Sequence, residues 1–212
     1  LLYPSRRPEV FPRLIAAEHR SESSRERLSS GLAGLDRLLG GGIERGSSTL
    51  VQGAAGTGKS TIAALFCCHA AAHGQAAAMF IFDESINTLL KRTDGLGIPL
   101  REHVNEGRVT IQQVDPAEYS PGELAHSVRR RVETDDARII VLDSLNGFLS
   151  SMPEENFLVV QLHELLTYLG QQGVASLIVS SQLGILGANM NAPVDASYLA
   201  DAVLLLRYYE VD

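Results

Sequence analysis

A glycine-rich loop between an expected strand and an expected helix constrains the fold of this chain more than any other feature. It lies in the segment SSTLVQGAAGTGKST, residues 47–61. Apolar and β-prone residues run into Gly53, small residues follow, and residues 59–61 open the apolar run TIAALFCCHAAA, which favours a helix. The order of glycines, lysine and serine in this loop matches the Walker A pattern, which needs a strand before it and a helix after it.

The pattern Gly53-x4-Gly58-Lys59-Ser60 predicts a site for phosphate groups. Gly53, Gly56 and Gly58 are expected to adopt positive φ, so that successive N–H groups point at phosphate oxygens. The positive end of the following helix dipole adds to this attraction. We expect Lys59 to reach the β- and γ-phosphates and the Ser60 hydroxyl to hold Mg²⁺. The expected nucleotide-binding residues are therefore Gly53, Ala54, Ala55, Gly56, Thr57, Gly58, Lys59, Ser60 and Thr61.

A glycine-rich turn beside an ordinary surface lysine is the alternative interpretation of this loop. The chain contains only two lysines, Lys59 and Lys91, in a sequence that otherwise uses arginine. Arginine is bulkier and planar, which suits it poorly to act as a point charge on phosphates. A lysine at this position therefore favours the nucleotide site over the surface turn.

The overall composition is typical of a globular domain with excess negative charge. Of the 212 residues 45% are hydrophobic and 20% are charged, and the formal net charge is −7. This charge argues against a protein built around nonspecific nucleic-acid binding. No apolar run approaches the ~20 residues of a membrane span, so we expect no membrane association. The only cysteines, Cys67 and Cys68, are adjacent in an expected helix, which favours reduced thiols and a cytoplasmic location.

Expected strands and helices alternate along most of the chain. Besides the strand before the glycine-rich loop and the helix after it, we expect strands at 27–30, 76–82, 108–114, 138–142, 174–180 and 198–209, and helices at 32–39, 86–96, 99–106, 121–133 and 156–171. This alternation predicts an α/β fold, a phosphate-loop NTPase with a twisted, mainly parallel sheet and helices on both faces. Residues 1–27 have many charges and little periodicity. We expect them to form an N-terminal arm or linker, with the nucleotide-binding domain over residues 28–212.

Polar side chains follow the expected strands at three points. Asp83 and Glu84 follow the run AAAMFIF, Asp143 follows RIIVL, and Gln182 follows the next core strand. Ligands of open α/β sheets lie at the carboxyl ends of the strands, so these side chains should lie beside the phosphate loop. Asp143 matches a Walker B aspartate, which holds Mg²⁺ directly or through a water. A carboxylate at Asp83 or Glu84 is expected to polarise the attacking water, and Gln182 to hydrogen-bond the γ-phosphate.

Each of these residues also has a purely structural interpretation. Asp143 would serve as a helix N-cap, and Asp83 or Glu84 would cap the next helix in competition with Ser85. Gln182 needs no role as a polar residue that leaves a strand. The Walker A pattern upstream favours the catalytic interpretation of the carboxylates, while both interpretations of Gln182 stay open.

Four segments of the sequence, in this order, resemble the KaiC branch of the RecA-like ATPases. They are SSGLAGLDRLLGGGIERGSSTLVQGAAGTGKST, FIFDES, RIIVLDSLNGF and LADAVLLLRYYE, and the resemblance extends over nearly all of residues 27–209. The stretch FPRLIAAEH resembles the linker before the second of two tandem KaiC-type domains, which implies that this chain corresponds to such a second domain. The family's basic residues that reach a neighbouring subunit's nucleotide come just after the YYE segment, so we expect a domain truncated at its C-terminal end.

The resemblance implies a RecA-like ATPase domain that uses ATP and Mg²⁺ and assembles into a homohexameric ring with nucleotide between subunits. In this family a pair of glutamates supplies the catalytic base and a Mg²⁺ contact, and the matching positions are Asp83 and Glu84. Aspartate is one methylene shorter, so Asp83 would act through a water or Glu84 would take over. Some members autophosphorylate a Ser-Thr pair, which falls here at Ser197 and Tyr198; Ser197 is the candidate phosphosite, and Tyr198 argues against a two-site cycle. The resemblance makes circadian clock protein a candidate description and signalling proteins candidate partners, but the sequence does not establish a circadian role.

Four functions compete on these observations. The leading one is a Mg²⁺-dependent ATPase, with Lys59, Asp83, Glu84 and Gln182 in catalytic roles. The second is a kinase that acts on itself at Ser197, and the third is a non-enzymatic, nucleotide-gated assembly module in signalling. The fourth is a DNA recombination or repair ATPase. It is disfavoured because residues 183–195 contain no Lys, Arg or aromatic residue that could bind a nucleic-acid strand.

Overall fold

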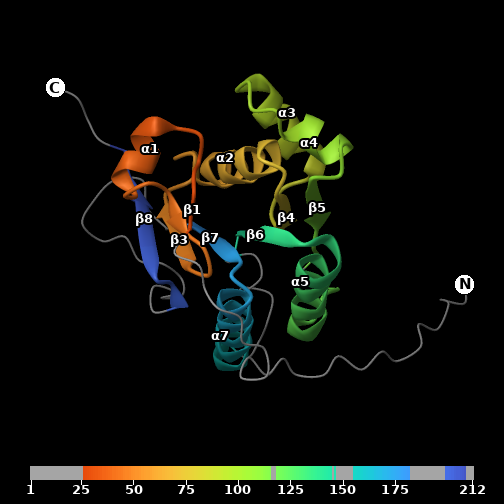
Figure 1. Ribbon diagram of the computed structural model, residues 1–212. Coiled ribbons are helices and arrows are strands. Elements are labelled where there is room, and N and C mark those ends of the chain that lie inside the picture. Colours follow the sequence, from red (N-terminus) through yellow and green to blue (C-terminus); the bar gives the residue numbers. More distant parts are fainter. Residues whose placement is uncertain (1–25, 116–117, 145, 147–154, 182–198, 209–212) are drawn as a thin grey trace, which may run out of the picture.

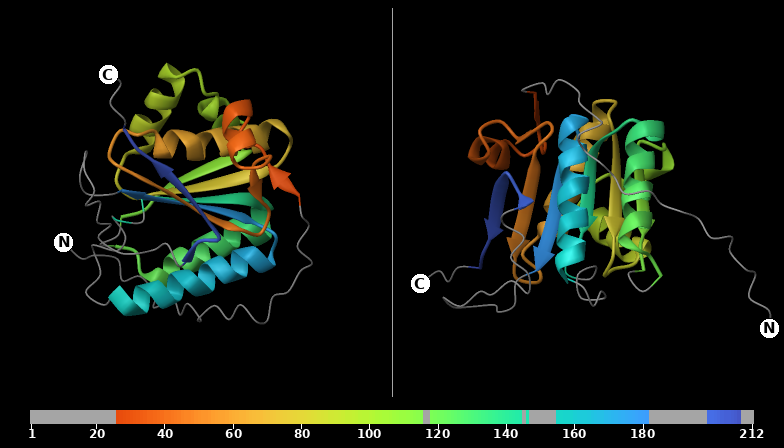
Figure 2. Two further views of the ribbon diagram at one scale, coloured as in Figure 1. Left: turned by 90° about the vertical axis from the view of Figure 1, so that its left-hand side faces the viewer. Right: turned by 90° about the horizontal axis from the view of Figure 1, so that it is seen from below.

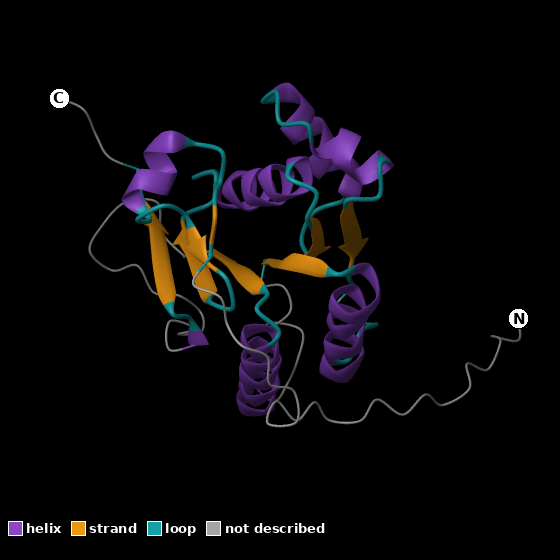
Figure 3. Ribbon diagram, in the orientation of Figure 1, coloured by secondary structure: helices purple, strands orange, loops and turns teal. Residues whose placement is uncertain are grey.

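The computed structural model describes residues 26–115, 118–144, 146, 155–181 and 199–208, with the backbone alone at 155–158. Its helices and strands are, in chain order, β1 (Arg27–Leu28), α1 (Ala33–Leu38), β2 (Ile43–Glu44), β3 (Ser48–Gly53), α2 (Lys59–Ala72), β4 (Ala76–Ile81), α3 (Ile86–Gly95), α4 (Leu100–Asn105), β5 (Val109–Gln113), α5 (Pro121–Asp135), β6 (Ala137–Asp143), α7 (Glu155–Gln171), β7 (Ala175–Ser181) and β8 (Ala202–Leu206). A central sheet lies between two groups of helices (Figures 1 and 3).

The central sheet has six strands in the order β5-β4-β6-β7-β3-β8, and every pairing in it is parallel. Parallel strands need crossover connections, and helices supply them on both faces. This confirms the predicted α/β fold of a RecA-like phosphate-loop domain. In the register of the sheet, Ile81 lies opposite Asp143, and Gly53 lies opposite Ser181. The carboxyl ends of β4, β6, β7 and β3 therefore meet at one edge.

Helices cover the two faces of the sheet in separate groups. Figure 2 shows α2, α3 and α4 on one face and α5 and α7 on the other. Along β4, Ala77, Met79 and Ile81 pack into the core under α2, while Ala78 and Phe80 pack into the core over α5 and α7. This alternation is the two-residue period of a strand, and because both faces are covered the strand is apolar throughout.

Local capping chemistry sets where two of the helices begin. Ser120 and Glu123 form a reciprocal capping box at the start of α5, with Pro121 in the first turn. Ser85 caps α3 and accepts a hydrogen bond from the backbone N–H of Thr88. The predicted helices at 121–133 and 86–96 are therefore confirmed to within two residues at their ends.

Two strands differ from the sequence prediction. The last strand is β8, residues 202–206, and not the longer segment 198–209, part of which lies outside the described residues. β2 was not expected at all, because it has only two residues and exists through its antiparallel pairing with β1. None of the described helices combines the length and the apolar character that a bilayer crossing requires.

Candidate active site at the carboxyl edge of the sheet

The phosphate loop joins the end of β3 to the start of α2. Gly56 and Gly58 have φ of 79° and 93°, a left-handed conformation that favours glycine. Gly58 is the N-cap of α2 and provides no side chain to cap it. The first N–H groups of α2 therefore lack a side-chain cap, which leaves them available to an anion.

Gly53 is glycine for a different reason from the one that the sequence predicted. Its φ is not among the positive ones, so the expectation of a left-handed residue here is wrong. A Cβ atom on Gly53 would lie 2.5 Å from the carbonyl oxygen of Leu206 and 2.9 Å from Oγ1 of Thr57. Gly53 therefore allows β8 and the loop to approach the end of β3 closely.

Lys59 is the first residue of α2 and is only 7% exposed. Its Nζ donates a hydrogen bond of 2.7 Å to the carbonyl oxygen of Ala54, across the loop. Burial lowers the pKa of Lys59, and the nearby Asp143 carboxylate acts in the opposite direction. The geometry is that of a buried cation held within the loop rather than a lysine on the surface.

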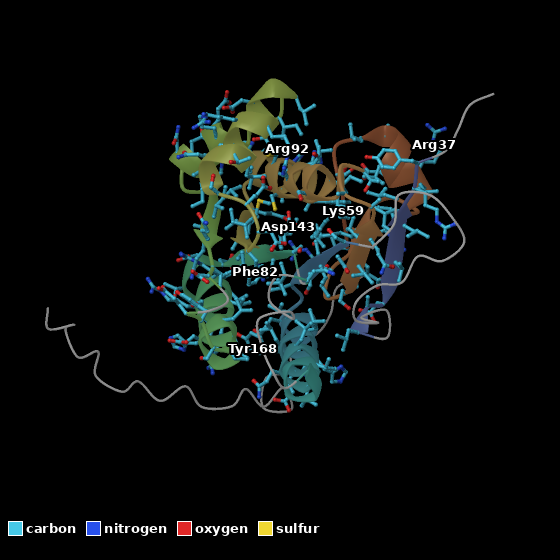
Figure 4. The ribbon with its side chains drawn as sticks, turned by 180° about the vertical axis from the view of Figure 1, so that it is seen from behind. Arg37, Lys59, Phe82, Arg92, Asp143 and Tyr168 are labelled. Atoms are coloured by element: carbon cyan, nitrogen blue, oxygen red, sulfur yellow. The ribbon has the colours of Figure 1, made fainter. Side chains whose placement is uncertain are left out.

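Asp143 ends β6 and lies near Lys59, as their electrostatic interaction and Figure 4 show. Its side chain is 7% exposed, and Oδ2 is buried without a hydrogen-bond partner among the described residues. Burial raises the pKa of Asp143, and the carboxylates of Glu84 and Asp83 raise it further, while a hydrogen bond from Ser60 and the charge of Arg92 lower it. A buried, partly unpaired carboxylate oxygen is costly unless a cation binds it.

The two carboxylates after β4 have different surroundings. Asp83 is exposed, and its Oδ2 accepts a hydrogen bond from the Ser144 hydroxyl at the end of β6. Glu84 is half-buried, and both of its oxygens accept hydrogen bonds from Arg92. Because Ser85 caps α3, the alternative that Asp83 or Glu84 caps this helix does not hold.

Arg92 is a charged residue of this edge that the sequence analysis did not single out. It lies on α3 and, together with Gly56, Gly58, Lys59, Ser60 and Thr61, lines a cavity of about 140 Å³ over the phosphate loop. The helical spacing of the sequence could have indicated that Arg92 lies near this edge. Arg92 follows the N-cap Ser85 by seven residues, two helical turns, so it lies on the helix face above the α3 N-terminus.

The remaining predicted residues lie largely beyond the described part of the chain. Gln182 and Ser197, like Tyr198, fall outside the described residues. The structure does describe the residue before Gln182. Oδ1 of Asn146 accepts hydrogen bonds from the backbone N–H of Ser181 and the hydroxyl of Ser180, which fixes the end of β7 beside β6.

The donor set at this edge fits Mg²⁺. Within the described ranges, no three or more His, Cys, Asp or Glu side chains gather as a complete metal site. Mg²⁺ in phosphate-binding proteins needs no such site, because it takes one or two protein ligands and fills its shell with waters and phosphate oxygens. The buried, unpaired Oδ2 of Asp143 and the Ser60 hydroxyl supply oxygen ligands of the required kind.

The parallel sheet, the glycine-rich loop and the buried lysine define this chain as a RecA-like phosphate-loop ATPase domain. The family model described as "ATPase: KaiC" matches residues 28–212. The chain therefore belongs to the KaiC ATPase family.

In the aligned regions, about a quarter of the residues of this chain are identical to those of named relatives. The circadian clock protein KaiC3 of Synechocystis is 27% identical over 93% of this chain and 39% of its own length. The circadian clock oscillator protein KaiC of Synechococcus elongatus is 26% identical over 95% of this chain and 38% of its own. KaiC2 of Synechocystis is 27% identical over 89% of this chain and 34% of its own. The chain thus spans about two fifths or less of the length of these relatives.

Proposed function

We propose that this chain is a Mg²⁺-dependent ATPase domain of KaiC type. The observation that carries the proposal is the proximity of two buried residues of opposite charge, Lys59 and Asp143, beside a helix N-terminus that has no side-chain cap. At the carboxyl edge of a parallel sheet, a positive group of this kind suits the phosphates of a nucleotide, and the negative group suits a divalent cation bound to them.

The phosphate loop would hold the nucleotide through its backbone and through Lys59. Residues 53–61 would form the cradle, and the N–H groups at the start of α2 would direct positive charge toward the phosphates. Lys59 would exchange its bond to the Ala54 carbonyl for phosphate oxygens, since a charged acceptor binds an ammonium more strongly than a neutral one. ATP and ADP are the ligands that we propose.

Ser60, Asp143 and Asp83 are the residues that we propose to hold Mg²⁺, directly or through waters. The bound ion would neutralise charge that develops on the transferred phosphoryl group. For Asp143 this gives the orphaned Oδ2 a partner. Asp83 reaches the same edge because its carboxylate is hydrogen-bonded to Ser144, the residue after Asp143.

Glu84 or Asp83 would accept a proton from the attacking water. Each carboxylate has about four lone-pair positions, so the hydrogen bonds that these residues already accept leave others for a water. Gln182, which follows the fixed end of β7, is proposed to contact the γ-phosphate. The water would attack in line with the leaving oxygen of ADP, and the proton would pass to the carboxylate.

We also propose that copies of the chain assemble into a homohexameric ring with nucleotide between subunits. The support is membership of the KaiC family, and the match to about two fifths of the relatives' length is compatible with one domain of a tandem protein. Because these relatives are named circadian clock proteins, we propose a role in a clock or in signalling, with other proteins as partners. The two free, buried cysteines agree with a reducing cytoplasm.

Autophosphorylation of Ser197 is the second function that we propose to test. Leu199 and Asp201, just downstream, contact Ser48 at the amino end of β3, whereas the phosphate loop starts at the other end, Gly53. A non-enzymatic assembly module, and less favourably a DNA recombination ATPase, are the remaining alternatives.

One incubation with Mg²⁺ and γ-labelled ATP separates these functions. Free phosphate and protein-bound label are followed together for the wild type, Lys59→Ala, Ser197→Ala and Lys91→Ala. Lys91 is the chain's other lysine and is exposed on α3, so it is the matched control. An ATPase releases phosphate in the wild type and the Lys91 variant but not in the Lys59 variant. Protein-bound label that is present in the wild type and in Lys91→Ala but absent in both Lys59→Ala and Ser197→Ala identifies an autokinase. Nucleotide-dependent oligomers without phosphate release identify an assembly module.

A further inference from the structure

The guanidinium group of Arg92 makes a two-pronged contact with Glu84. Nη1 donates to Oε2 at 2.9 Å, and Nη2 donates to Oε1 at 2.7 Å. The Arg92 side chain is 38% exposed and that of Glu84 is 21% exposed, so the pair is half-buried. Arg92 comes from the end of α3, and Glu84 immediately precedes the N-cap of the same helix. The pair therefore connects the helix to the loop that leaves β4.

This pair differs from an ordinary surface salt bridge of the same chain. Arg101 donates from both Nε and Nη2 to a single oxygen of Asp94, and both side chains are more than 40% exposed. Such exposed pairs contribute little to stability. The Arg92 fork instead fixes the plane of the Glu84 carboxylate, because two parallel hydrogen bonds remove its rotation.

Arg92 also lines the phosphate-loop cavity together with Lys59, Ser60 and Thr61. The Glu84 carboxylate is hydrogen-bonded to this lining residue, and it lies close enough to Asp143 to raise the pKa of that group. The fork uses one lone-pair position on each oxygen of Glu84 and leaves the outer ones free to accept a proton from a water. Orientation of a reacting group is worth more than its presence alone, since a misplaced base loses most of its effect.

We propose that Arg92 is a positioning residue that holds the Glu84 carboxylate in a fixed orientation toward the phosphate-loop cavity. This inference rests on the proposed ATPase function and names the residue through which Glu84 acts. Lysine cannot replace Arg92 fully, because an ammonium is a point charge and does not form the planar fork.

The test measures turnover and nucleotide affinity separately in the full chain. The variants are Arg92→Ala, Arg92→Lys, Glu84→Gln and the double variant Arg92→Ala/Glu84→Gln, with Arg101→Ala as an exposed-arginine control. Affinity is measured with a fluorescent ADP analogue in EDTA and again with Mg²⁺, and thermal unfolding checks that each variant folds. We expect Arg92→Ala to lower kcat about 10–100-fold, as loss of an orienting partner does elsewhere, with less than about threefold change in nucleotide Kd. Arg92→Lys should be intermediate, and Arg101→Ala unchanged.

The double variant decides between a positioning role and an independent one. If Arg92 acts through Glu84, its removal costs nothing further once Glu84 is glutamine, because the two effects are not additive. Additive losses in kcat would overturn the proposal, as would a loss of affinity with unchanged kcat, which would make Arg92 a phosphate ligand. Unchanged kcat in Arg92→Ala would overturn it as well. A wild type that neither binds nor hydrolyses ATP would instead overturn the proposed function, and the role of Arg92 with it.

Discussion

Replacement of Asp143 by asparagine is expected to stabilise the protein when Mg²⁺ and nucleotide are absent. The Asp143 carboxylate is 7% exposed, and its Oδ2 has no partner among the described residues. A buried polar group without a partner costs about 1–3 kcal/mol, and a charged one costs more. A neutral amide in the same place costs less to bury and is not repelled by Glu84 and Asp83. It gives up attractions to Lys59, Ser60 and Arg92, but the pKa of Asp143 is raised on balance, so the unfavourable contributions to the buried charge are the larger ones. We therefore expect the variant to gain about 1 kcal/mol of stability at neutral pH.

Urea unfolding in EDTA measures this gain. With a slope of about 2 kcal/mol per molar urea, the midpoint of Asp143→Asn should lie about 0.5 M above that of the wild type. The pKa of Asp143 is raised above its ordinary value of 3.8, so in the window between 3.8 and the raised pKa the folded protein binds more protons than the unfolded one. Wild-type stability should fall as the pH rises through this window, and the asparagine variant should lack that fall.

In the presence of Mg²⁺ and ADP the wild type should become more stable than Asp143→Asn, the reverse of the order in EDTA. A ligand that binds only the folded state stabilises it in proportion to RT ln(1 + [L]/Kd), so the wild type gains more if Asp143 holds the ion. Asp94→Asn is the control, since Asp94 is exposed and already bound to Arg101. The reasoning is refuted if Asp143→Asn is no more stable than the wild type in EDTA.

Three further predictions concern helix capping and buried side chains away from the candidate site. Ser120→Ala removes the capping box of α5 and should cost about 1 kcal/mol, measured as a lower urea midpoint with an unchanged slope. Burial, and then the Glu133 carboxylate, raise the pKa of Tyr168 to about 12. The stability that Tyr168 contributes is thus present below its ordinary pKa of about 10 and is lost as the pH rises through about 12. Phenolate absorbance should show a late titration that Tyr168→Phe removes. Burial raises the pKa of Cys67, and that of Cys68 to about 11, so a thiol reagent should react with both only after denaturation.

The sequence predicted those elements whose signals are local. The strand β4 was found because its apolar run is bounded by polar residues, and α5 because Ser120-Pro121 and Glu123 are a helix-start signature. The phosphate loop was found because its chemistry needs particular residues at a fixed spacing. Pairings between distant segments were not accessible in this way. The short strand β2 forms only through its contact with β1, and the order of the six strands depends on crossovers that no local pattern encodes.

In the candidate site too, features with local signals were predicted, and features that depend on contacts between distant segments were not. Asp143 and the Asp83-Glu84 pair were placed correctly at the carboxyl edge of the sheet, because parallel strands bring their ends together. The role of Gly53 was misread, since the close approach of Leu206 comes from a segment more than 150 residues away. Arg92 was missed because its significance lies in the fork to Glu84 and the cavity that it lines, both of which require the folded helix.

Calorimetric titration of Mg·ATP into the wild type, Lys59→Met and Lys91→Met tests the central claim most directly. Methionine keeps much of the volume of lysine and removes the ammonium that now meets the Ala54 carbonyl. A charged hydrogen bond contributes about 1.5–3 kcal/mol, so two lost phosphate contacts amount to at least about 3 kcal/mol, or roughly a hundredfold in Kd. We predict this loss for Lys59→Met and wild-type affinity for Lys91→Met. Equal affinity in all three proteins would contradict the assignment of residues 53–61 as the nucleotide site.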